Sequence, residues 1–202
     1  MEPTDSRVIH GELLKLNTSG FTLVEMMIVI VVMAIAFSLA IPSFNGMIQR
    51  NRIAVQVNDF LLAVNLARSE AMRRGSQVTV QSADNGAESA NEFGNGYCVQ
   101  IGAPGDSGFS TSCTYSAGRC SPIQMAGCVL RDFEPLTGTS SLDSEENSSA
   151  ITFGSLGELS ANTVQNLDMC DSRGLADGRR IVVSLIGRSR SYNNDALTPP
   201  TC

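Results

Sequence analysis

Side chains that could do chemistry are unevenly distributed along this chain of 202 residues. His10 and Lys15 are the only histidine and the only lysine, and both precede Gly20. The rest of the chain therefore has no imidazole to activate a serine or cysteine nucleophile and no lysine to form a Schiff base. It also lacks a histidine for a His-containing zinc site. We therefore expect no catalytic residue, no metal site and no cofactor, and we interpret the chain as a protein that is not an enzyme.

One short motif could suggest otherwise. Gly105-Asp106-Ser107-Gly108 has the residue order of the nucleophile motif of chymotrypsin-type proteases. That motif needs a histidine base, and none follows Gly20. We interpret the motif as a polar turn.

A cluster of arginines near the C-terminus is the one patch with a plausible ligand. No acidic residue lies between positions 178 and 194, and the segment contains Arg179, Arg180, Arg188 and Arg190. On an extended segment Arg188 and Arg190 face the same side, and guanidinium groups suit phosphate oxygens. Tyr192 continues the alternation and offers a stacking surface. DNA binding is one hypothesis for this cluster, and a hairpin turn with solvated arginines is the other. The net charge of −6 argues against a general nucleic-acid coat.

The N-terminal part of the chain predicts a membrane anchor. From Met26 to Ile41 there is no charged residue, and Ser38 is the only polar one. A helix from Phe21 to Phe44 would be roughly 36 Å long, enough to cross a bilayer core. Glu25 lies inside the apolar run, where an acid is costly and indicates a function.

The helix is expected to continue beyond this segment with one apolar stripe. The stripe has steps of three and four residues and comprises Ile53, Val57, Phe60, Val64, Ala67 and Ala71. Such a stripe packs a helix onto a sheet, and Gly75 is a suitable terminator.

After Gly75 the sequence predicts strands. Extended patterns occupy residues 77–81, 96–101, 128–133, 150–157, 164–170 and 179–186, the last of which turns at Gly187. Residues 102–127 are predicted to form a long loop, and the acidic segment 137–149 is predicted to be exposed.

The six cysteines indicate disulfides in an oxidising compartment. Sequence alone allows fifteen pairings. We expect Cys113–Cys120 within the long loop, Cys98–Cys128 between neighbouring strands, and Cys170–Cys202 to hold the tail.

The segment Ser19-Gly20-Phe21-Thr22-Leu23-Val24-Glu25-Met26-Met27 resembles the prepilin cleavage motif of type IV pilins and type II secretion pseudopilins. The resemblance implies cleavage between Gly20 and Phe21 and methylation of the new Phe21 amine. It implies that Glu25 pairs with an N-terminal amine in the filament and that Pro42 kinks the helix. The leader departs from the family pattern, because it is long and carries Glu2, Asp5 and Glu12.

Two further segments resemble one branch of that family. The helix end at residues 66–74 and the order of the last strands resemble the GspH/FimT minor pilins. The resemblance implies an α+β pilin fold, in which a long N-terminal helix packs on an antiparallel sheet. The expected organisation is a leader at 1–20, a transmembrane segment at 21–44, an amphipathic helix at 45–75, and a β-rich periplasmic head domain at 76–202.

The function implied by this resemblance is structural. We expect a minor pilin in the priming or tip complex of a type IV pilus, anchored in the inner membrane and then incorporated into the pilus at the cell surface. Its expected partners are other minor and major pilins, which it contacts through the N-terminal helix, and the prepilin peptidase. One alternative is a DNA receptor for natural transformation, because Gly187-Arg188-Ser189-Arg190 resembles the Gly-Arg-x-Arg element of some FimT-type pilins. Another is pseudopilin H of type II secretion.

Overall fold

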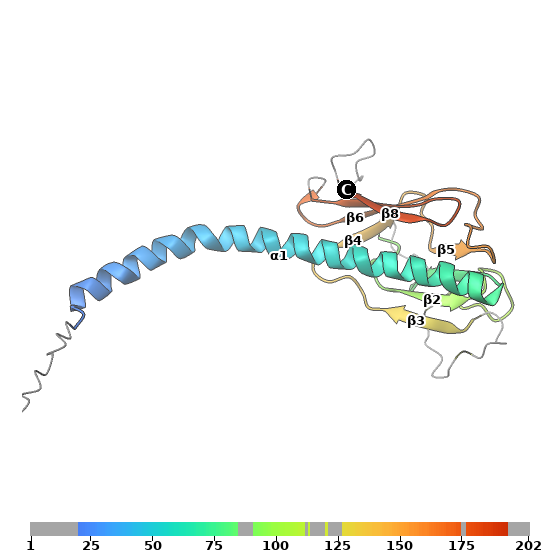
Figure 1. Ribbon diagram of the computed structural model, residues 1–202, viewed down its shortest axis with the longest axis horizontal. Coiled ribbons are helices and arrows are strands. Elements are labelled where there is room, and N and C mark those ends of the chain that lie inside the picture. The colour runs from blue at the N-terminus through green and yellow to red at the C-terminus, as the bar shows by residue number, and fades with distance from the viewer. Residues whose placement is uncertain are drawn as a thin grey trace, which may run out of the picture. The chain divides into compact units, whose positions relative to one another are not determined.

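The computed structural model describes residues 20–84, 91–111, 113, 120, 127–174 and 177–193, without the side chains of residues 39, 40, 42 and 43. One long helix, α1 (Leu23–Arg74), precedes a series of short strands (Figure 1). The strands in the described part of the chain are β1 (Val78–Ser82), β2 (Tyr97–Ile101), β3 (Val129–Phe133), β4 (Ser141–Ser144), β5 (Ala150–Phe153), β6 (Gln165–Cys170), β7 (Arg179–Val183) and β8 (Ser189–Asn193).

The chain divides into two compact units, Met1–Asn45 and Gly46–Cys202, and α1 contributes to both. In the first unit the described side chains of the helix are exposed. Among the residues that the structure describes, no helix combines the length and the apolar character that a membrane crossing requires. We call the second unit the globular unit.

The core of the globular unit forms where α1 meets the strands. The predicted stripe is confirmed, because all six of its residues are at most 1% exposed. Phe60 packs edge to face against Phe93 and Tyr97, with ring centroids 5.4 and 5.1 Å apart. Apolar residues of both sheets complete the same cluster. Burial of this stripe supplies the main driving force for folding the helix onto the sheets.

The strands form two antiparallel sheets, with the orders β3-β2-β1-β5 and β4-β6-β7-β8. The expected α+β architecture, a long N-terminal helix packed on antiparallel strands, is confirmed, although the strands divide into two sheets. All six predicted strands are present. Most of their ends differ from the prediction by one residue, but β5 ends at Phe153 and β7 at Val183, before the predicted ends at 157 and 186. The sequence prediction missed β4 and β8 because they consist mainly of serine and charged residues, without the apolar enrichment typical of a strand.

Two of the expected disulfides are wrong. The structure joins Cys98 to Cys113 and Cys120 to Cys128, with Cα separations of 5.6 and 5.9 Å. Cys98 lies in β2 and Cys128 directly precedes the neighbouring β3, but the antiparallel register pairs Cys98 with Asp132 and places Cys128 beside Ile101. The two cysteines therefore lie about 10 Å apart along the strands, too far for a disulfide.

The third expected disulfide is only partly visible. Cys170 is disulfide-bonded, and its expected partner, Cys202, lies outside the described residues.

Candidate functional site

The predicted processing motif lies at the start of α1. Gly20 and Phe21 precede the helix, and the Phe21 side chain is 75% exposed. Thr22 is the N-cap residue, because its hydroxyl accepts a hydrogen bond from the Glu25 N–H at 3.2 Å. The pattern Thr22-x-x-Glu25 is that of a capping box, and an acid in the first turn interacts favourably with the helix dipole. Glu25 therefore has a local role in starting the helix, which the sequence analysis overlooked.

The other residue implied in assembly cannot be assessed in the same way. Pro42 lies within α1, but its side chain is outside the described residues.

The four arginines of the C-terminal cluster do not form one patch. Arg179 and Arg180 are successive residues of β7, so their side chains point to opposite faces of the sheet. Arg180 is buried and forms a bidentate pair with Asp168 of β6, with N–O distances of 2.8 and 2.7 Å. This hydrogen bonding raises the pKa of Arg180 above its ordinary value. Arg180 therefore stabilises the sheet and is not available to a ligand.

Arg188 and Arg190 are placed differently. Both are exposed, and neither forms an ion pair with another described residue. Together with Tyr192 they line a hollow of about 240 Å³ whose apolar part comes from Val182 and Ile186. The β7–β8 register pairs Val182 with Arg190, so these side chains share one face. The arrangement offers two cations and an aromatic ring to an anionic ligand.

The turn before these arginines has a structural role. Gly187 has a φ of +74°, and a Cβ at this position would collide with the carbonyl oxygen of Gly157. Arg68 of α1 donates a hydrogen bond to the same carbonyl at 3.1 Å. Helix α1, the turn at Gly157 and the turn at Gly187 therefore meet at this point. This packing is enough to explain why residue 187 is a glycine, and no ligand is needed to explain it. The sequence analysis missed Arg68, whose only signal was its position beside the apolar stripe.

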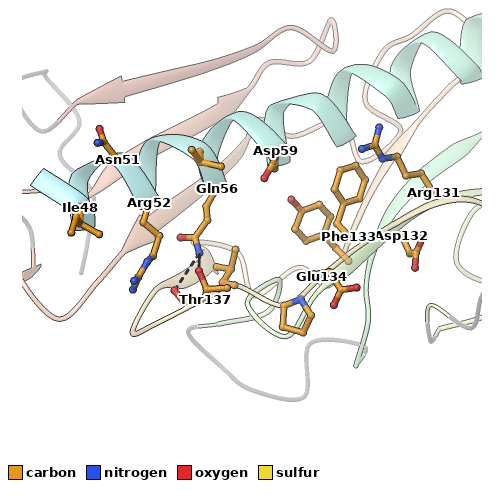
Figure 2. Close-up of a pocket in the computed structure, with 14 residues that line it drawn as sticks. Ile48, Asn51, Arg52, Gln56, Asp59, Arg131, Asp132, Phe133, Glu134 and Thr137 are labelled. Atoms are coloured by element: carbon orange, nitrogen blue, oxygen red, sulfur yellow. Dashed lines mark hydrogen bonds between the residues drawn. The ribbon is translucent and has the colours of Figure 1, made fainter.

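A second hollow lies between α1 and β3 and was not predicted (Figure 2). Its volume is about 590 Å³, with six lining residues from α1 between Ile48 and Asp59 and seven between Arg131 and Thr137. Its walls are mainly apolar, and β3 is an edge strand among the described residues. Tyr97 stacks on Phe133 at 4.8 Å in the same region. Sequence could not indicate this hollow, because it depends on how β3 sits beside the helix.

Polar groups of this hollow are partly satisfied. Gln56 donates hydrogen bonds to the carbonyl and hydroxyl oxygens of Thr137, each at 3.3 Å, as Figure 2 shows. Its other amide atom, Oε1, is buried and has no partner among the described residues. Burial, together with the nearby Asp59, raises the pKa of Tyr97. The hollow contains neither a cysteine nor a histidine, so it offers surface for contact and no activated nucleophile.

Two other predictions about chemistry can be placed. Asp106 accepts a hydrogen bond from the Ala103 N–H at 2.8 Å, and its own N–H donates to the Ala103 carbonyl, so the protease-like motif is a polar turn. Among the described residues, no group of three or more acidic, cysteine or histidine side chains is arranged to hold a metal ion.

Known protein families match both parts of the chain. Residues 56–187 match the family described as Type II transport protein GspH. Residues 15–41 match the prokaryotic N-terminal methylation motif. No curated protein matches the sequence.

Solved structures share the fold. The type IV minor pilin FimU of Pseudomonas aeruginosa is 19% identical with a TM-score of 0.56, covering 75% of this chain and 95% of FimU. A second crystal form of FimU gives 17% identity and a TM-score of 0.51, covering 71% and 93%. The minor pseudopilin EpsH of Vibrio cholerae is 14% identical with a TM-score of 0.45, covering 72% and 99%.

Proposed function

The chain belongs to the GspH family, and from this membership we propose that it is a minor pilin, a structural subunit of a type IV pilus. One observation carries the proposal: a methylation motif over residues 15–41 and a GspH region over residues 56–187 share a single helix, α1. In this proposal the peptidase cuts after Gly20, and the apolar part of α1 anchors the chain in the inner membrane before assembly.

Assembly in this proposal depends on the N-terminal half of α1. Its large apolar side chains are exposed, including Met33 and Phe37, and helices of neighbouring pilins would cover them. Glu25 would pair with an N-terminal amine, since a carboxylate in apolar surroundings needs a cation. The leader at 1–20, the anchor at 21–44, the helix at 45–75 and the head domain at 76–202 are the functional divisions of this proposal.

A fractionation experiment tests this function. The full chain should be found in sheared pili, and Glu25→Ala should greatly reduce that fraction without changing the amount of folded protein in the membrane. Ser38→Ala is the matched control, because it changes the other polar side chain of the apolar run and leaves the charge in place. Equal amounts of Glu25→Ala and parent in pili would contradict the pairing role.

The same experiment separates pilus assembly from the pseudopilin alternative. If the chain acts as pseudopilin H, deleting the secretion system should abolish its incorporation into a filament, and deleting the pilus machinery should not. The neighbouring genes give an independent indication of which system it serves.

DNA binding remains a second candidate because Arg188, Arg190 and Tyr192 line one exposed hollow. Gel-shift binding by the globular unit should fall when both arginines are changed to alanine. In a plot of the logarithm of affinity against the logarithm of salt concentration, each lost phosphate contact should reduce the steepness of the slope by about 1. A control with Arg73→Ala and Arg131→Ala removes the same charge elsewhere. Binding that is absent in the parent, or that falls equally in the control, would exclude this candidate.

A further inference from the structure

The outer edge of β4 is covered by a short segment that is not a strand. The N–H of Leu142 donates to Asn91 Oδ1 at 2.9 Å, and the Phe93 N–H donates to the Leu142 carbonyl at 3.1 Å. The N–H of Ser144 donates to Glu92 Oε2 at 2.9 Å. Residues 91–93 therefore satisfy three backbone groups of an edge strand, two of them with side chains.

The carboxylate that serves this edge lies among other acids. Glu92 is only 2% exposed, and Asp143 of β4 faces it. From β6, Asp168 lies opposite Asp143 in the register, and Glu145 lies directly after the end of β4. On the same face, Arg180 of β7 lies 2.7 Å from Asp168 and 3.9 Å from Glu145. Two of the four carboxyl groups, Asp168 and Glu145, therefore pair with Arg180, whereas Asp143 interacts with the other acids.

Such a cluster favours keeping a proton. Two carboxyl groups form a hydrogen bond with each other only when one of them is protonated, and neighbouring like charges disfavour ionisation of both. Burial raises the pKa of Asp143 to about 6, and the hydrogen bond with Glu92 and the charges of Glu92, Asp168 and Glu145 act in the same direction.

We propose that Glu92 and Asp143 form a proton-dependent latch, in which a shared proton holds residues 91–93 on the edge of β4 in acid and its loss at neutral pH loosens them. Loosening exposes the N–H groups of Leu142 and Ser144 at the edge of the sheet. The globular unit thus carries a pH-sensitive edge, separate from the helix proposed to mediate assembly.

The direction and size of the effect follow from linkage. The pKa of Asp143 is higher with the latch closed than its ordinary value of 3.8, so protonation stabilises the closed state. This stabilisation is complete well below pH 4 and is lost as the pH rises through about 6. Between pH 5 and pH 8 the ratio of closed to open states should fall by up to about tenfold, the limit that applies if opening returns the pKa of Asp143 to its ordinary value.

Hydrogen exchange of the full chain in detergent micelles tests the latch. Protection factors, corrected for intrinsic exchange, are measured at pH 5 and pH 8 for the amides of Phe93, Leu142 and Ser144. In the parent they should fall severalfold, up to about tenfold. In Asp143→Asn they should change less than about twofold, because the amide donates to Glu92 at every pH. Asp106→Asn, an exposed acid in a distant turn, is the control and should behave as the parent does.

Results for the parent and for the variants can each contradict the latch. Protection that is independent of pH in the parent, or that falls equally in Asp143→Asn, overturns the proposal. Glu92→Gln provides a second variant, because it keeps an acceptor for Ser144 and removes the charge. It too should abolish the pH dependence, and a tenfold fall in this variant would contradict the latch.

Discussion

Replacing Arg180 by alanine should destabilise the globular unit far more than replacing any surface arginine. Its side chain is 7% exposed and that of Asp168 is 2% exposed, and two hydrogen bonds of 2.8 and 2.7 Å join them. The substitution removes the guanidinium that faces a buried carboxylate, while the acids Glu145 and Asp143 remain nearby. Breaking a buried ion pair from one side costs on the order of 3–5 kcal/mol.

Urea unfolding of the globular unit at pH 7, followed by circular dichroism, measures this cost. Arg188→Ala is the matched control, because its side chain is exposed and its loss should change the free energy of unfolding by less than about 0.5 kcal/mol. A double variant, Arg180→Met with Asp168→Leu, should recover most of the loss, since it removes both members of the buried ion pair. If Arg180→Ala and Arg188→Ala cost the same, the assignment of Arg180 to the sheet is wrong.

Two further predictions concern the globular unit. Gly187→Ala should lower the free energy of unfolding by about 2 kcal/mol or more, because it combines a left-handed backbone with a collision at the Gly157 carbonyl. Gly46→Ala is the control, because Gly46 is in a helix and has open space for a Cβ; it should be neutral or stabilise the protein by up to about 1 kcal/mol. A similar loss of stability in both variants would argue against a special requirement for glycine in the turn at Gly187. Replacing Cys98 and Cys113 by serine should cost about 2–4 kcal/mol in thermal or urea unfolding, and an unchanged stability would contradict that pairing.

The sequence predicts the helix and its buried face well. The stripe around Phe60 follows the helical period, so burial could be read directly from spacing. The β-rich part was less predictable: β4 and β8 are polar, and their place in the sheet comes from hydrogen bonding to β6 and β7. A pattern of apolar residues does not record such pairing.

Features that depend on register were beyond the sequence. Arg180 and Arg188 look alike in a count of charge, yet one lies opposite Asp168 and the other lies in solvent. The disulfide predictions were wrong for the same reason, since the register places Cys98 opposite Asp132 and not opposite Cys128. The burial of Glu92 also depends on its contact with β4, which is distant in sequence, and no local sequence motif predicts that contact.

The N-terminal motif, by contrast, is local. Gly20, Phe21 and Glu25 lie within six residues, so sequence could identify them, and the structure adds the N-cap at Thr22. Their role in processing and assembly remains a prediction.

Intact-mass and N-terminal peptide measurements on the protein from sheared pili test the central claim most directly. We predict a chain that begins at Phe21 with a methyl group on its amine and lacks residues 1–20. A chain in the pilus fraction that still begins at Met1 would contradict the proposal that this protein is processed and assembled as a pilin.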